Sequence, residues 1–216
     1  MANHSTTTPA HLLHHYVDSD QQFDAAKLGM WIFIVTETLM FGGLFGAYIV
    51  YRVLYPELFT LASEELDTIM GSINTVVLIG SSLTVALAIK SAQVNNKRNI
   101  IINLAITLAL ACVFMIIKYF EYTHKFELGI FPGVYYEYGG IDHPQAHIFF
   151  SIYYMMTGLH GIHITIGIGL MIWLLVKASK NEFHSGYYTP VEIVGLYWHL
   201  VDIIWIFLFP LFYLID

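Results

Sequence analysis

One carboxylate stands inside a long apolar stretch near the start of the chain. Glu37 lies within LGMWIFIVTETLMFGGLFGAYIVYR, residues 28–52, a run long enough to cross a bilayer. At a helical rise of about 1.5 Å per residue, Glu37 falls close to the middle of such a span. A lone charged carboxylate at that depth is strongly destabilising, so we expect Glu37 to be neutral, paired or next to water. An ionisable residue in this position is a candidate for proton exchange or for binding a polar ligand.

Two histidines are the best candidates for pairing with Glu37. His160 and His163 stand three residues apart in GLHGIHITIGIG, residues 158–169, and so share a face of a helix. We expect Glu37 to form a hydrogen bond with one of them. A haem or metal site built from His160, His163 and His199 is an alternative, but it would need further ligands that converge on these side chains.

A second group of polar residues lies near the C-terminus. Glu192, His199 and Asp202 are seven and three residues apart, which places them on one stripe of a helix. Lipid would leave such groups unsatisfied, so the stripe is expected to face protein or water. All three residues are therefore candidate polar partners within the membrane.

The composition indicates a membrane protein. Of the 216 residues, 57% are hydrophobic and 12% are charged, and a soluble domain carries about twice that charge. The mean hydropathy is +0.64. The net charge of −7 argues against nucleic acid as a partner.

The apolar runs predict an all-α, polytopic bundle of five transmembrane helices. We expect these helices at about residues 28–52, 69–89, 100–117, 148–176 and 190–215, so that residues 28–216 form the membrane domain. Residues 1–27 read as a polar N-terminal tail. This tail contains four histidines, His4, His11, His14 and His15, whose spacing is not that of a metal-binding motif.

The distribution of positive charge predicts the orientation. Six Lys and Arg residues flank the helices on the side of the N-terminus, and three flank them on the opposite side. Because positive loops favour the cytoplasm, the N-terminus is expected inside and the C-terminus outside.

Small residues recur at helical spacing in two of the predicted helices. Gly42 and Gly46 form one row, and Gly161, Thr165 and Gly169 form another. Rows of this kind let a second helix approach closely, so both are expected to be packing surfaces.

Three further features have simple structural interpretations. Glu121 and Lys125 are four apart, in the order that favours a surface ion pair at a helix end. Residues 128–147 are rich in Gly, Pro and aromatic residues and are expected to form an ordered cap at the membrane surface. Cys112 lies in an apolar run and is expected to be a small buried hydrophobic residue.

Together, the motifs resemble subunit III of the haem–copper oxygen reductases. YWHLVDIIWIFLFPLFYLI, residues 197–215, resembles the last helix of that family, and GLHGIHITIG, residues 158–167, resembles its penultimate helix. WIFIVTETLMFGGLFGAY, residues 31–48, resembles its helix with a buried glutamate, and INTVVLIGSSLT, residues 73–84, resembles the next one. The match covers all five helices in order, as in the short bacterial members, whereas longer members have two more helices at the start.

The resemblance implies an accessory subunit of a respiratory oxidase that reduces O₂ to water and pumps protons. Such a subunit has no catalytic residue, metal or redox centre, because haem and copper belong to its partners. It binds the catalytic subunit I and supports proton uptake, phospholipid binding and stability of the enzyme in a bacterial cytoplasmic membrane. On this resemblance, Glu37 takes the place of a carbodiimide-reactive glutamate, and Lys177 falls where the family often has an arginine near a lipid headgroup.

Other assignments stay open from sequence alone. Subunit III of a quinol oxidase, or a similar partner of a nitric oxide reductase, would carry nearly the same motifs. A stand-alone proton channel or transporter would use Glu37 and the C-terminal stripe. The sequence has no inverted repeats or broken helices of the kind that transporters use, which disfavours the last alternative.

Overall fold

The structure, a computed structural model, describes residues 12–215 and is built from helices. Their bounds are α1 Ser19–Leu54, α2 Pro56–Glu64, α3 Thr68–Gln93, α4 Lys97–Glu127, the 3-10 helix η1 Gly133–Tyr135, α5 Ala146–Ser179 and α6 Thr189–Tyr213. Within the described residues, five helices are long and apolar enough to cross a membrane, namely α1, α3, α4, α5 and α6. This confirms the predicted all-α membrane bundle.

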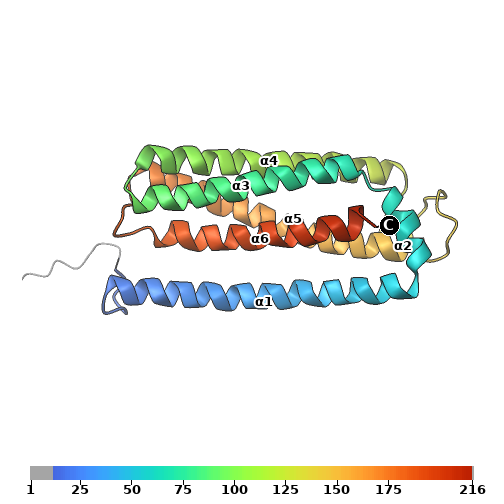
Figure 1. Cartoon of the computed structure of the whole chain (residues 1–216), viewed down its shortest axis with the longest axis horizontal. Coiled ribbons are helices and arrows are strands. Elements are labelled where there is room, and N and C mark those ends of the chain that lie inside the picture. The colour runs from blue at the N-terminus through green and yellow to red at the C-terminus, as the bar shows by residue number, and fades with distance from the viewer. Residues whose placement is uncertain (1–11, 216) are drawn as a thin grey trace, which may run out of the picture.

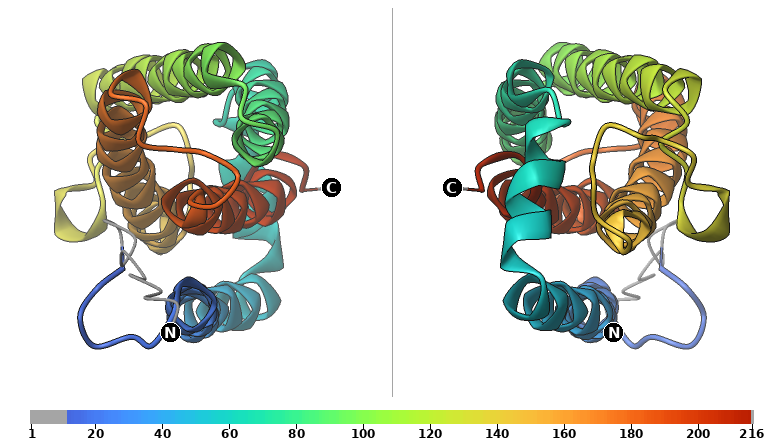
Figure 2. Two further views of the ribbon diagram at one scale, coloured as in Figure 1. Left: turned by 90° about the vertical axis from the view of Figure 1, so that its left-hand side faces the viewer. Right: turned by 90° about the vertical axis from the view of Figure 1, so that its right-hand side faces the viewer.

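Four of the spanning helices form a bundle, and the fifth lies along its side. In Figure 1 all five run side by side, with α1 at one edge. The end-on views in Figure 2 show α3, α4, α5 and α6 grouped together, while α2 crosses one end to join α1 to the group. Helix α3 packs on α4 and α6, and α5 packs on the same two helices. The interior of this bundle is therefore separated from lipid, whereas α1 is contacted mainly on the side that faces α6 and α5.

Two tryptophans occupy the centre of the bundle. Trp198 and Trp205 of α6 are fully buried. Their indole N–H groups donate to Ser81 Oγ at 2.9 Å and to Thr75 Oγ1 at 3.1 Å, both on α3. Hydroxyl groups on α3 thus satisfy the polar atoms of large side chains that fill the core.

The first helix is longer than the sequence suggests. Helix α1 begins at Ser19, whereas the apolar run predicts a start at about residue 28, so the helix includes the last part of the polar segment. The side chain of Asp18 caps the helix by accepting a hydrogen bond from Gln21 N–H at 2.7 Å. Hydropathy marks only the part of a helix that lies in lipid, and capping extends this one beyond it. The tail residues His4 and His11 lie outside the described residues.

Two other boundaries differ for related reasons. Helix α4 continues to Glu127 instead of ending near residue 117, because charged residues in its last turns are buried against the bundle. The segment after α1, which lies between the first two expected helices, contains α2, and Pro56 occupies its first turn as proline often does.

The predicted glycine rows do not pack against other helices within residues 12–215. A Cβ atom added at Gly42, Gly46, Gly161 or Gly169 would meet no heavy atom within 4 Å. Close packing occurs at other glycines, which the small-residue rows do not single out. Cys112 is exposed, so the expectation that it is buried is also wrong. Both differences arise because one sequence cannot tell a face that meets another helix of the chain from a face that meets lipid or a partner.

The segment between α4 and α5 is ordered by side-chain contacts. Ile130 is fully buried, and its carbonyl accepts a hydrogen bond from Tyr154 OH at 2.8 Å. Tyr138 OH donates to Glu65 Oε1 at 2.9 Å, and this hydrogen bond raises the pKa of the Tyr138 phenol. The segment therefore ties the end of α4 to the connection between α2 and α3.

Candidate functional site

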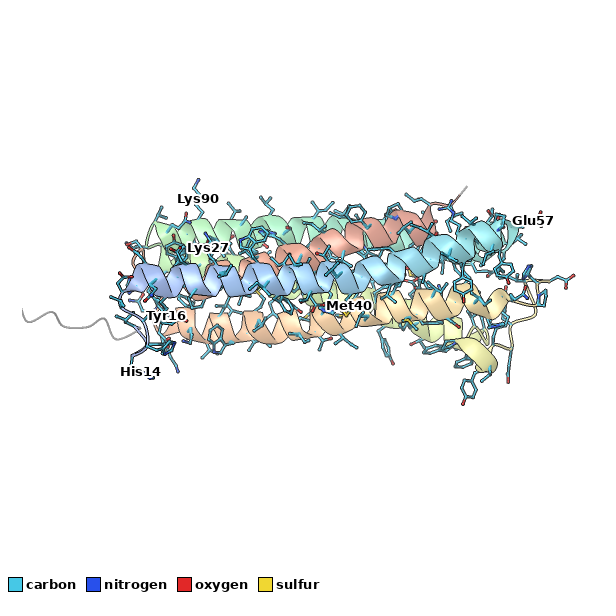
Figure 3. All side chains as sticks on the ribbon, turned by 90° about the horizontal axis from the view of Figure 1, so that it is seen from below. His14, Tyr16, Lys27, Met40, Glu57 and Lys90 are labelled. Carbon is cyan, nitrogen blue, oxygen red and sulfur yellow. The ribbon has the colours of Figure 1, made fainter. Side chains whose placement is uncertain are left out.

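Glu37 and His163 meet between α1 and α5. Glu37 lies near the midpoint of α1, and its Oε2 is 3.1 Å from Nε2 of His163. The side chains are 15% and 10% exposed, respectively, so the contact is largely enclosed. Met40, three residues after Glu37, lies midway along the molecule in Figure 3. The carboxylate is thus far from both ends of the bundle.

The other ring nitrogen of His163 fixes the proton count of this pair. His163 Nδ1 is 2.8 Å from the carbonyl oxygen of Leu159. A carbonyl only accepts, so Nδ1 carries a hydrogen and donates it. The contact between Nε2 and Oε2 then requires one proton, which is held either by the imidazole or by the carboxyl group. The pair can therefore store one proton and exchange it between two atoms.

Aromatic groups surround His163. The Phe41 ring approaches it edge-on, with ring centroids 5.5 Å apart. Tyr197 OH donates to the backbone carbonyl of His163 at 2.8 Å. The Phe41 ring lowers the polarity beside the imidazole, which strengthens the electrostatic interaction of His163 with Glu37, while the Tyr197 hydrogen bond fixes the backbone of α5 at this position.

His160 has a different environment although it is one helical turn away. Its ring is fully buried inside the bundle and stacks on Trp205, with centroids 5.4 Å apart. Neither ring nitrogen has a hydrogen-bond partner among residues 12–215. The predicted hydrogen bond of Glu37 therefore forms with His163, and His160 is not part of the pair.

The predicted stripe on α6 divides into three separate environments. Glu192 forms an ion pair with Lys27 of α1, and Lys27 Nζ lies 2.8 Å from Glu192 Oε1. His199 Nδ1 is 2.7 Å from Ser82 Oγ of α3. Asp202 is buried, and its carboxyl oxygens have no hydrogen-bond partner in the described part of the chain. The structure brings none of these three residues to Glu37.

Polar contacts attach α1 to the bundle near both ends and in the middle. Lys27 and Glu192 meet near one end, and Figure 3 shows Lys27 there. Glu37 and His163 meet in the middle, and Tyr48 OH donates to the Leu211 carbonyl toward the other end. These contacts matter because few side chains of α1 are buried.

No metal centre is evident in what the structure describes. Between residues 12 and 215, no group of three or more His, Cys, Asp or Glu side chains could hold a metal ion. The three histidines considered for a haem or metal site are divided among different partners: Glu37 for His163, Trp205 for His160, and Ser82 for His199.

Comparison with known proteins identifies the family. The family model for cytochrome c oxidase subunit III matches residues 14–216. The chain belongs to this family. "Cytochrome c oxidase subunit 3" of a Synechocystis species is 30% identical over 212 residues, covering 98% of this chain and 83% of that one.

Two further relatives carry other names. "Heme-copper oxidase subunit I+III" of Aeropyrum pernix is 30% identical, over 89% of this chain and 23% of its own. "Probable quinol oxidase subunit 3" of Staphylococcus haemolyticus is 28% identical, over 88% of each chain. The chain is thus an accessory oxidase subunit III and a multi-pass membrane protein.

Lys177 of this subunit III is already engaged within the chain. Its Nζ is 3.2 Å from Glu182 Oε2 and lies 4.8 Å from the centroid of the Trp173 ring. A lipid phosphate at this position would have to share the ammonium group with Glu182.

A buried ionic cluster was missed by the sequence interpretation. Lys118 Nζ donates to Glu121 Oε2 at 2.9 Å and to Tyr213 OH at 2.7 Å, and Lys125 Nζ is 3.4 Å from Glu121 Oε1. The expected pair of Glu121 and Lys125 therefore forms, but both residues are buried and the pair does not lie at the surface. One signal could have found the cluster: the spacing of buried residues on α4 continues through the charged positions, in the order Thr107, Ala111, Phe114, Lys118, Glu121 and Lys125.

Proposed function

We propose that this subunit III holds an exchangeable proton at Glu37 and His163 and supports proton uptake by the catalytic subunit of a haem–copper oxidase. The observation that carries the proposal is the contact between His163 Nε2 and Glu37 Oε2, with Nδ1 already committed to Leu159. A group that keeps one proton in a largely enclosed site can act as a local proton store.

Membership of the family supports a wider proposal about the complex. The catalytic partner is subunit I, in line with the relative whose name joins subunits I and III in one chain. The haem and copper reside in partner subunits, and this chain contributes no redox centre. The complex lies in a bacterial cytoplasmic membrane, with the N-terminus of this chain inside. Cytochrome c or quinol is the electron donor, and oxygen uptake by the purified complex with each donor in turn distinguishes them.

The first prediction concerns the proton held by the pair. Glu37→Gln and His163→Gln both keep a polar side chain in place but cannot hold the proton. We expect each variant oxidase to take up protons several-fold more slowly and to lose activity in fewer turnovers. The measurement is proton uptake and oxygen consumption by the whole oxidase in vesicles.

The control is Glu57→Gln, which removes an exposed carboxylate at the far end of the molecule (Figure 3). This variant should behave as wild type. Wild-type proton uptake and lifetime in both Glu37→Gln and His163→Gln, with normal assembly, would reject the proposal.

Phospholipid is the second proposed ligand, held in apolar grooves beside α1. A groove of ≈ 650 Å³ lies between α1 and α5, with Met40, Gly43 and Leu44 facing Tyr154 and Leu159. A second groove, of ≈ 400 Å³, lies between α1 and α6. Their apolar linings suit acyl chains, which gain nothing from polar neighbours.

The second prediction tests this assignment by filling the groove between α1 and α5. Gly43→Leu should lower the amount of phospholipid that copurifies with the oxidase, because the new side chain occupies space that an acyl chain would use. The control is Gly46→Leu, since Gly46 also faces open space but lines neither groove. Lipid phosphorus and mass spectrometry provide the measurement, and equal lipid content in both variants would contradict the assignment.

A further inference from the structure

Asp202 is a second carboxyl group in the membrane interior, and it is independent of Glu37. It is only 2% exposed, and neither of its carboxyl oxygens has a hydrogen-bond partner among the described residues. The residues beside it on α6 face α3: Trp198 donates to Ser81, and His199 contacts Ser82. Ser82 also lies near the Asp202 carboxyl group. Asp202 therefore belongs to the interior between α6 and α3, whereas Glu37 lies between α1 and α5.

Two other buried polar side chains without partners in the described chain are related to Trp205, the tryptophan that follows Asp202 on α6. Asn74 of α3 is fully buried, and both atoms of its amide lack a partner in the described chain. It precedes Thr75, which accepts the indole N–H of Trp205, and Asp202 stands one turn before Trp205 on α6. His160, also without a partner at either nitrogen, stacks on the same indole. His160 thus contacts Trp205 directly, Asn74 adjoins the Thr75 partner of Trp205, and Asp202 precedes Trp205 by three residues on α6.

The surrounding helices offer Asp202 no counter-ion. Lys118 of α4 donates hydrogen bonds to Glu121, Tyr153 and Tyr213. Of the histidines, His163 on α5 is engaged by Glu37 and Leu159, His199 on α6 is engaged by Ser82, and His160 is enclosed by Phe114 and Trp205. Among residues 12–215, Asp202 makes no ion pair with any of them.

Burial then decides the form of this side chain. An ionised carboxylate without a counter-ion or hydrogen bonds is strongly destabilised in a low-dielectric interior, so the neutral acid is favoured. A neutral acid still has one O–H donor and acceptor oxygens to satisfy, and Asn74 adds amide donors and an acceptor. Clusters of buried polar groups of this kind are satisfied by internal water, which typically makes about three hydrogen bonds.

We propose that Asp202 and Asn74 form an internal hydrated site between α6 and α3, in which water molecules are bound and Asp202 holds a proton. The ligands are therefore water and a proton. The site requires no contribution from Glu37 or His163, so it can be tested independently of the proton store at Glu37 and His163.

Infrared spectroscopy of the whole oxidase tests the protonation of Asp202. At neutral pH, the wild-type spectrum minus the Asp202→Asn spectrum should contain one carbonyl stretching band of a protonated carboxylic acid, and the band should shift in D₂O. The same band should persist in Glu37→Gln, and it should move to a different frequency in Asp202→Glu, which keeps an acid at the site and serves if Asp202→Asn fails to assemble. Two results would overturn the proposal. One is that the spectrum of wild type minus Asp202→Asn contains carboxylate bands in place of the acid band. The other is that the acid band disappears in Glu37→Gln and not in Asp202→Asn.

A high-resolution cryo-EM map of the assembled oxidase tests the bound water. We expect solvent density within hydrogen-bonding distance of both Asp202 and the Asn74 amide. We also expect loss of this density in Asn74→Leu, whose side chain has similar size but no polar atoms. A direct hydrogen bond between Asp202 and another protein group, with no solvent density between α6 and α3, would overturn the hydrated site.

Discussion

Glu121 shows how charge can be buried near the end of a spanning helix. Its Oε1 accepts hydrogen bonds from Tyr153 OH and Tyr213 OH, each at 2.6 Å, while its Oε2 faces Lys118 at 2.9 Å. The cluster joins α4 to α5 and α6. Two lysines surround one carboxylate, so removing that carboxylate would leave both ammonium groups without their main partner.

The third prediction follows from this cluster. Glu121→Gln keeps the size of the side chain but removes its charge, and we expect a loss of about 3–5 kcal/mol in stability, as for other buried ion pairs from which one partner is removed. Thermal unfolding of the purified oxidase and the amount of subunit III retained in it provide the measurements. Glu127→Gln, at an exposed position on the same helix, is the control and should change stability little. Equal effects of the two substitutions would mean that the cluster does not stabilise the subunit.

At the scale of helices, glycine has two distinct uses in this fold. A Cβ atom at Gly167 of α5 would lie 2.5 Å from Cζ3 of Trp198, and a Cβ atom at Gly195 of α6 would lie 2.5 Å from Cδ1 of Ile89. These two positions let helices approach within the bundle. A Cβ atom at Gly42 or Gly46 of α1 would meet no other helix among residues 12–215, so this row is not used for packing within the described bundle.

The fourth prediction separates these uses. Gly167→Ala should destabilise the bundle by about 1–3 kcal/mol, the usual effect of overpacking, because the Trp198 ring is held by Ser81 and cannot move freely. Gly46→Ala should leave the stability of the separated subunit unchanged. Thermal unfolding of detergent-solubilised subunit III provides the comparison. If Gly46→Ala were as destabilising as Gly167→Ala, the row on α1 would have to pack within the chain after all.

Over the whole molecule, the sequence is most informative where lipid imposes a simple requirement. Apolar length alone identifies all five spanning helices, and the cost of a buried charge directs attention to Glu37 and its histidine partner. The choice between His160 and His163 depends on how α5 is rotated, which spacing alone does not give. Polar segments are harder to predict from sequence. The buried cluster around Glu121 has the sequence of an exposed helix end, and its burial follows only from the packing of α5 and α6.

Orientation in the membrane is the last property of the whole molecule that can be predicted. Six of the nine Lys and Arg residues, namely Lys27, Lys90, Lys97, Arg98, Lys177 and Lys180, flank one side of the bundle. On the other side Lys118 and Lys125 are buried with Glu121, which leaves Arg52 as the remaining basic side chain and strengthens the bias.

The fifth prediction is that, after Cys112→Ala, a membrane-impermeant thiol reagent added to intact cells labels Glu57→Cys but not His14→Cys. Figure 3 shows these positions at opposite ends of the molecule. Permeabilised cells should give labelling at both positions, and the reverse pattern in intact cells would place the N-terminus outside.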